Sequence, residues 1–171
     1  MNRECQSIPP RVQRVVPNCR SALVCSVRVI ALAPACRSGQ SGRVTDRLAA
    51  NKEAAQAFYD LMFNQSKARE AIDRFAGDDY RQHNPHVGDG KDAFVEYFDR
   101  MALEWPGKRV EFRRVIAEDD FVVLHCFQHW PNDHDYAGID IFRFDGNGKI
   151  VEHWDALQVI PDYSKNDNGM F

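Results

Sequence analysis

Several features are scarce or missing in this sequence, and each absence excludes a class of protein. Four of the five cysteines lie within the first 36 residues, so no disulfide framework holds the later part together. No apolar run reaches the roughly 18 residues that a membrane-spanning helix needs. No serine lies in a nucleophile elbow, and the Gly-Asn-Gly-Lys stretch at 146–149 is typical of a hairpin turn. Neither nucleophilic serine chemistry nor a nucleotide cofactor is therefore indicated.

Lysine is missing from the first 47 residues, which hold eight arginines and two acids and carry a charge of +6. Residues 48–171 hold 14 basic and 23 acidic residues and carry −9. A folded part this acidic is a poor candidate for binding a phosphate backbone, so we expect no nucleic-acid partner. The length of 171 residues suits one domain with a sizeable core.

The first 46 residues differ from the rest in composition. Residues 21–36 combine a basic lead-in with an apolar stretch, as in an export signal, although Arg28 interrupts the apolar run. The richness in arginine also fits a mitochondria-like presequence, and a disordered or spurious extension is a third alternative. We therefore divide the chain into an extension over 1–46, a domain over 47–163 and a flexible tail over 164–171. Unless the extension is a leader, we expect a cytoplasmic protein.

Apolar spacing predicts three helices in the first half of the domain. The first covers 45–63 with Thr45 as its N-cap, and the second runs from Ser66 to Gly77. A third helix begins after Gly90 and ends before Pro106. Between the second and third helices, residues 80–85 indicate a short strand that leads into a loop, because asparagine before proline favours an extended backbone.

After residue 106 the apolar period changes from 3.6 to 2. Strands are predicted at 110–116, 121–130, 136–144 and 150–157, and the Asp-Gly-Asn-Gly turn at 145–148 joins the last two. Helices followed by an antiparallel meander predict an α+β fold in which the helices cover one face of a curved sheet. Such a twisted sheet can form a cone with a pocket inside.

Polar side chains lie inside the last two strands, where aspartate is normally depleted. Asp140 shares a face with aromatic residues, and His153 shares a face with Asp155. A carboxylate among aromatic side chains on a concave face is desolvated, which suits it to acid/base chemistry near neutral pH. We therefore expect a pocket that holds Asp140, Asp155, His125 and His83. The alternatives are an outward-facing polar row and a buried hydrogen-bonded network.

The spacing of the histidines does not predict a metal site. His125 and His129 are four strand residues apart, roughly 13 Å, which is too far for them to share an ion. Cys126 points away from His125, so we expect a buried core cysteine rather than a Cys-His nucleophile pair. Trp130 and Trp154 can stack on a flat ligand, pack in the core or form an interface.

Four motifs stand out along the domain. They are Tyr-Arg-Gln-His-Asn-Pro at 80–85, Ala-Glu-Asp-Asp at 117–120, Asp-Ile-Phe-Arg at 140–143 and Gly-Lys-Ile-Val-Glu-His-Trp-Asp at 148–155. With them, residues 47–163 resemble the SnoaL-like polyketide cyclase family, within the NTF2-like superfamily. The combination is similar to a subgroup of predicted aldol-condensation enzymes.

The resemblance implies an α+β cone, a homodimer and no cofactor. In cyclases of this family, an aspartate on a late strand takes a proton from the carbon next to a carbonyl and returns one to the alkoxide. Asp155 matches that position, and Asp140 and His125 complete the expected catalytic set. The expected substrate-binding side chains are His83, Tyr59, Trp130 and His153.

The leading interpretation is a cofactor-free lyase or isomerase that acts by proton transfer on a small carbonyl compound. The fold also occurs in proteins without catalytic activity. A small-molecule-binding module and a protein-interaction domain are therefore the two alternatives.

Overall fold

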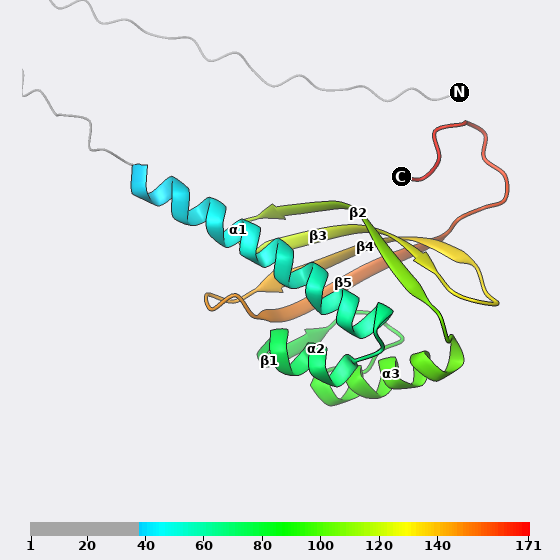
Figure 1. Cartoon of the computed structure of the whole chain (residues 1–171), viewed down its shortest axis with the longest axis horizontal. Coiled ribbons are helices and arrows are strands. Elements are labelled where there is room, and N and C mark those ends of the chain that lie inside the picture. Colours follow the sequence, from blue (N-terminus) through cyan, green and yellow to red (C-terminus); the bar gives the residue numbers. More distant parts are fainter. Residues whose placement is uncertain (1–37) are drawn as a thin grey trace, which may run out of the picture. The chain divides into compact units, whose positions relative to one another are not determined.

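The computed structural model describes residues 38–171, with side chains from residue 42 onward (Figure 1). Most of the expected extension, residues 1–37, lies outside this part. In chain order the elements are α1 Ser38–Tyr59, the π-helical turn η1 Asp60–Asn64, α2 Ala68–Phe75, β1 Ala76–Gln82, α3 Lys91–Glu104, β2 Arg109–Glu118, β3 Phe121–His129, β4 Asp135–Phe144 and β5 Ile150–Val159. Helices therefore precede the antiparallel meander, and the predicted α+β class is confirmed.

Within the described residues, the strands form one mixed sheet in the order β1-β5-β4-β3-β2. The predicted meander from β2 to β5 is antiparallel throughout, and β1 adds a parallel edge strand beside β5. This edge strand begins at Ala76, earlier than the predicted strand at 80–85. Gly77 belongs to this strand, because α2 already ends at Phe75. A Cβ at residue 77 would lie 2.9 Å from Val151 Cγ1 of β5. The close approach of β1 to β5 thus requires glycine.

The first helix differs from its prediction at the N-terminal end. It begins at Ser38, before the expected domain boundary at residue 47, so Thr45 is not its N-cap. The Thr45 hydroxyl instead donates to the carbonyl of Gly42 at 2.7 Å, one turn back inside the helix. Residues 42–47 are exposed, and a polar helical turn leaves no apolar pattern from which its start could be predicted.

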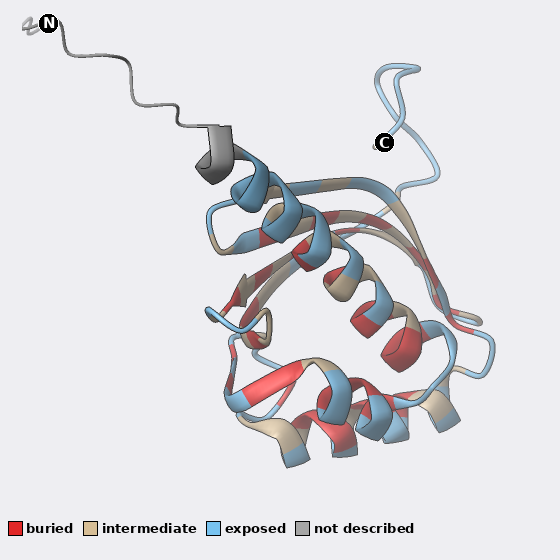
Figure 2. Cartoon of the chain, turned by 60° about the vertical axis from the view of Figure 1, so that its left-hand side comes forward, coloured by how far each residue is buried: buried red, intermediate tan, exposed pale blue. Residues whose placement is uncertain are grey.

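The core lies between the three α-helices and the concave face of the curved sheet. Phe58 of α1, Phe94 of α3 and Phe142 of β4 are at most 1% exposed. Their rings lie 5.5 Å (Phe58 to Phe94) and 5.8 Å (Phe58 to Phe142) apart between centroids. Burying each such side chain stabilises the fold by about 1.5–3 kcal/mol. Figure 2 shows the buried positions in red along the parts of the helices and strands that face one another.

The segment after β5 contains no helix or strand among its described residues. Its last residue, Phe171, nevertheless contacts the sheet, with its ring 5.2 Å from that of His125 between centroids. None of the described helices is both long and apolar enough to cross a membrane.

Candidate active site

The two strand aspartates lie next to each other on the concave face of the sheet. In the register, Asp140 of β4 pairs with Asp155 of β5 on one side and with Leu124 of β3 on the other. His153 follows on the same face of β5, opposite Phe142. Asp140 is completely buried and His153 is 4% exposed, so these polar groups lie inside the core rather than on an outward-facing row.

One chain of hydrogen bonds runs from Trp130, just after β3, to Asp140. Trp130 Nε1 donates to Gln128 Oε1 (3.1 Å), Gln128 Nε2 donates to the Tyr59 hydroxyl (2.8 Å), and that hydroxyl donates to Asp140 Oδ1 (2.9 Å). Since an indole N–H can only donate, the direction of the whole chain is determined. Burial, with the neighbouring Asp140 charge, raises the pKa of Tyr59 well above its usual range. The phenol therefore stays protonated and donates a hydrogen bond to Asp140.

A second chain of hydrogen bonds places a hydrogen on Nδ1 of His153. The backbone N–H of Asn84 donates to Gln82 Oε1 (3.0 Å), while Gln82 Nε2 donates to the Tyr80 hydroxyl (3.2 Å). The Gln82 oxygen therefore also faces His153 Nδ1, 3.0 Å away. Because a buried contact between two acceptors is unfavourable, His153 Nδ1 carries a hydrogen and donates it. The other ring nitrogen, Nε2, lies 3.4 Å from Asp140 Oδ1.

Asp140 Oδ2 has no hydrogen-bond partner among the described residues, although it is buried. A Cβ built on Gly138 would lie 3.4 Å from this oxygen and 3.0 Å from Gln128 Nε2. Because residue 138 is a glycine, no side chain covers Asp140 Oδ2 from that position. A buried polar atom without a partner is costly, and such atoms are rare outside functional positions.

Asp155 is only partly buried, and its carboxylate is held by the loop after β1. Asn84 Nδ2 donates to Asp155 Oδ2 at 2.7 Å, and Asn84 Oδ1 accepts the backbone N–H of His86 at 2.8 Å, which fixes the orientation of the amide. The pKa of Asp155 is raised, mainly by burial and further by the charge of Asp140. The charges of His153 and His86 and the hydrogen bond from Asn84 oppose this rise in pKa. A carboxyl group with a raised pKa is a better general base near neutral pH.

Asp155 lines a narrow cavity of about 30 Å³ at the mouth of this network. The volume is sufficient for a group the size of a water molecule. Aromatic and apolar side chains form most of the wall, which consists of Tyr59, Phe63, Asn84, Tyr97, Phe98, Met101, Gln128, Trp130, Asp155 and Leu157. A larger hollow of about 550 Å³, between Asp79 and Val151, contains none of these residues and is polar and open. We place the site at the smaller cavity because the buried network ends there.

Most of the predicted site residues meet around this cavity. Asp155, Tyr59 and Trp130 line it, and Asp140 and His153 lie behind Asp155. Three further residues, Gln82, Asn84 and Gln128, were not predicted. Gln82 and Asn84 belong to the motif at 80–85, where they flank the histidine that was chosen.

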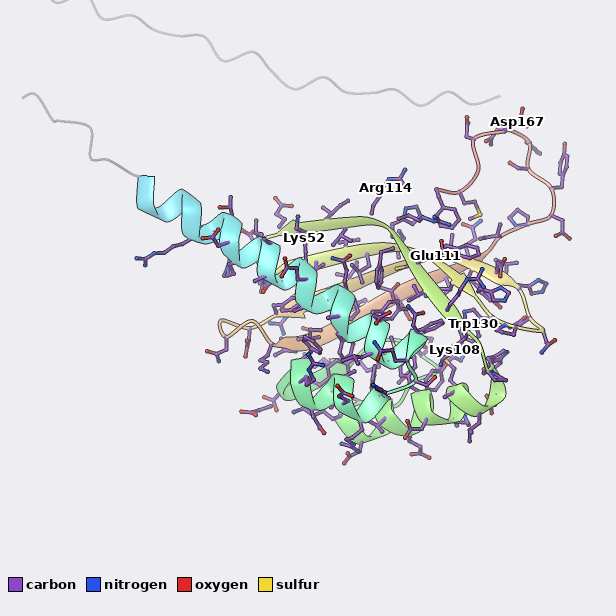
Figure 3. The ribbon with its side chains drawn as sticks, viewed as in Figure 1. Lys52, Lys108, Glu111, Arg114, Trp130 and Asp167 are labelled. Atoms are coloured by element: carbon purple, nitrogen blue, oxygen red, sulfur yellow. The ribbon has the colours of Figure 1, made fainter. Side chains whose placement is uncertain are left out.

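Two predicted site residues, His125 and His83, lie away from this cavity. His125 pairs with Ile139, one position out of phase with Asp140, and therefore lies on the convex face of the sheet, with its Nδ1 3.0 Å from an Arg114 nitrogen. Figure 3 shows Arg114 pointing away from α2 and α3. His83 also faces this side, where its Nε2 lies 2.9 Å from Glu152 Oε1 and its ring stacks on Trp154. The strand 121–130 is apolar on both faces, so alternation alone did not indicate which face is concave.

The prediction for Cys126 is confirmed, since it is buried and has a free thiol. Its side chain lies on the concave face, opposite in direction to His125. Burial, with the charge of Asp140 nearby, raises the pKa of the Cys126 thiol above its usual range. A protonated, buried thiol is a poor nucleophile, so this residue packs in the core.

The residues that could hold a metal ion, among those described, are Asp140, His153 and Asp155. One ligand atom of each lies within 4.8 Å of the others. Two ligands on one zinc ion, at about 2.1 Å each, can be at most about 4.2 Å apart. A separation of up to 4.8 Å exceeds this limit, so the three side chains would have to move closer together to share one ion.

Residues 55–153 match the SnoaL-like domain family. Among solved structures, TsrD from Streptomyces laurentii is 20% identical, with a TM-score of 0.54 over 64% of this chain and 88% of that one. A candidate polyketide cyclase from Bacillus cereus is 23% identical, with a TM-score of 0.54 over 61% and 71%. A candidate isomerase of the SnoaL-like family from Agrobacterium tumefaciens is 16% identical, with a TM-score of 0.55 over 64% and 98%. At these identities the likeness shows the fold alone. No curated protein matches the chain.

Proposed function

Since this chain belongs to the SnoaL-like domain family, we propose that it is a cofactor-free enzyme that moves protons on a small carbonyl compound. The reaction is an aldol-type cyclisation or an isomerisation, which makes the protein a lyase or isomerase. The names of two structural relatives, a candidate cyclase and a candidate isomerase, support this class of chemistry.

The observation that carries the proposal is the position of Asp155. It is the carboxylate on the wall of an otherwise largely aromatic cavity, and its pKa is raised mainly by burial. Asn84 holds one carboxylate oxygen in place at 2.7 Å. A fixed, partly desolvated carboxylate beside an apolar cavity is suited to removing a proton from carbon.

In the proposed step, Asp155 removes a proton from the carbon next to the substrate carbonyl. The electron pair of the C–H bond forms a carbon–carbon double bond, and the carbonyl oxygen becomes an enolate oxygen. In the aldol route the enolate carbon then bonds to a second carbonyl carbon, and protonated Asp155 returns its proton to the resulting alkoxide. In isomerisation the proton returns to another carbon, so neither route needs a redox partner.

We assign stabilisation of the enolate oxygen to Asn84 and Gln128. Each side-chain amide nitrogen carries two hydrogens. One hydrogen of Asn84 is donated to Asp155 and one of Gln128 to Tyr59, so each has a second one for a ligand in the cavity that both residues line. Amide N–H groups already held in position stabilise developing negative charge without reorganising.

Asp140 acts as a hydrogen-bond acceptor at the inner end of the site. Its Oδ1 is held by Tyr59, and its Oδ2 is open beside Gly138. A hydroxyl group of the substrate would supply the donor that this oxygen lacks. His153 lies beside Asp140, with its Nε2 3.4 Å from Asp140 Oδ1, so both residues support the site from behind Asp155.

The test is deuterium exchange at the α-carbon of a panel of β-keto and hydroxy-keto compounds, followed by NMR. We expect exchange with the wild-type protein and none above background with Asp155→Asn. The matched control is His125→Gln, because His125 lies on the convex face and should not affect exchange. If no compound exchanges although the protein is folded and binds them, the non-catalytic small-molecule-binding module takes the place of the enzyme.

The convex face supports a second property, association into a homodimer. Its exposed apolar side chains include Ile116 (58% exposed), Ile139 (40%) and Phe121 (39%). Apolar side chains grouped on one sheet face are typical of a protein–protein contact. We expect Ile139→Lys to convert a dimer to a monomer in light scattering. A wild-type protein that is already monomeric at high concentration would contradict this proposal.

A further inference from the structure

A second cavity lies directly outside the site, and the two share part of their walls. This outer cavity has a volume of about 280 Å³ and is lined by His86, Tyr97, Arg100, Met101, Glu104 and Trp105. Tyr97 and Met101 of α3 also line the inner cavity that contains Asp155. The two cavities therefore lie next to each other along α3.

Two further contacts connect the outer cavity with the site. Trp105 of the outer cavity packs edge-to-face on Trp130 of the inner one, at 5.1 Å between ring centroids. The backbone N–H of His86 donates to Asn84 Oδ1 at 2.8 Å, and Asn84 Nδ2 donates to Asp155 Oδ2 at 2.7 Å. Figure 3 shows Trp130 near the C-terminal end of α3.

The outer cavity differs from the inner one in its charged groups. Arg100 and His86 supply N–H donors, and Glu104 supplies the opposing acid. Arg100 Nε lies 3.7 Å from Glu104 Oε1, which is longer than a hydrogen bond, and both side chains are about half exposed. An exposed pair of this kind is weak, and the remaining N–H groups of the guanidinium stay available.

Resting on the proposed function, we propose that the outer cavity is a subsite for a carboxylate, so that the substrates are keto acids. The guanidinium of Arg100 binds the carboxylate through its terminal nitrogens, and the imidazole of His86 donates a further hydrogen bond. Tyr97 and Met101 contact the carbon chain that connects the carboxylate to the carbonyl group. A keto acid then spans both cavities, with its reacting carbon beside Asp155.

Glu104 gives the proposal a characteristic signature. Its charge opposes a bound carboxylate, so removing it should strengthen the binding of acids, whereas removing the charge of Arg100 should weaken it. A neutral ligand of the same shape should respond to neither change. Opposite effects of two neighbouring substitutions are not expected if these side chains only stabilise the helix.

The experiment compares levulinate with its methyl ester by NMR titration. We expect the wild-type protein to bind the acid about fivefold more tightly than the ester, the size of a partly exposed charge pair. Arg100→Gln should remove this preference, Glu104→Gln should increase it, and salt should reduce it. Arg74→Gln is the matched control, because Arg74 forms the equivalent exposed pair with Glu70 on α2.

Equal binding of acid and ester by the wild type would overturn the proposal, as would a preference that survives Arg100→Gln and His86→Gln together. The same samples in D₂O report proton exchange at the α-carbon. Acid preference without exchange would refute the proposed enzyme and leave the subsite in place. Exchange without acid preference would refute the subsite alone.

Discussion

Replacing Tyr59 by phenylalanine tests the buried network most simply, because it removes one oxygen and leaves the ring. That hydroxyl is the donor to Asp140 Oδ1 and the acceptor for Gln128 Nε2. Asp140 would keep the contact to His153 Nε2 at 3.4 Å and the neighbouring Cys126 thiol, which replace the Tyr59 hydroxyl only in part. Leaving a buried polar group without its partner costs about 1–3 kcal/mol, and two groups lose a partner here.

Allowing for some relaxation, we expect Tyr59→Phe to lower the free energy of unfolding by about 2–4 kcal/mol. That is a large part of the roughly 5–15 kcal/mol that stabilises a domain. Urea unfolding at neutral pH measures the change. The same substitution at Tyr136, whose hydroxyl donates to Asp133 at 3.3 Å on an exposed part of the surface, should change stability by less than about 0.5 kcal/mol. Equal effects of the two substitutions would refute the network as a source of stability.

Three further predictions concern the residues around Tyr59. Because the pKa of Asp155 is raised on folding, its ionised form destabilises the native state. Asp155→Asn should therefore raise the urea midpoint relative to wild type, increasingly as the pH rises above 3.8, the ordinary pKa of an aspartate. In more acidic solution the substitution should bring no gain in stability. A difference in stability that does not depend on pH would contradict this. Gly138→Ala places a methyl group 3.4 Å from Asp140 Oδ2, so it should weaken the binding of hydroxy-keto compounds. It should also cost about 1–3 kcal/mol of stability by overpacking, because the methyl group would lie 3.0 Å from Gln128 Nε2 and 3.1 Å from Leu157 Cδ2. Unchanged binding of these compounds would argue against a role for Oδ2. Gln82→Leu removes the acceptor of the Nδ1 hydrogen of His153, so ¹⁵N NMR should show a hydrogen on Nδ1 in the wild type and a smaller Nδ1–H population in the variant, whereas equal populations would refute the assigned hydrogen bond.

The fold could be predicted from sequence because its signals are local. The change of apolar period after residue 106 and the turn at 145–148 predicted the meander, and the register of its last hairpin places Asp140 opposite Asp155. The start of α1 could not be predicted, because the sequence there is mostly polar and residues 42–47 are exposed. The parallel pairing of β1 was missed for a related reason, since an edge strand rich in polar residues carries a weak alternation signal.

The candidate site could be predicted only where strand parity decides which residues meet. Asp140, His153 and Asp155 came together as expected, because they belong to one hairpin. The partners that orient them are distant in sequence: Tyr59 is 81 residues from Asp140, and Gln82 is 71 residues from His153. No local pattern indicates such contacts. His125 was placed on the wrong face because both faces of its strand are apolar.

The central claim is that Asp155 acts as the base, and the pH dependence of deuterium exchange at the substrate α-carbon tests it most directly. We expect the exchange rate to rise with pH as Asp155 ionises, with a midpoint above 3.8, because burial raises the pKa of Asp155. The His125→Gln variant should give the same curve, and Asp155→Asn should give none. An Asp155→Asn variant that retains the wild-type rate and pH dependence would contradict the claim.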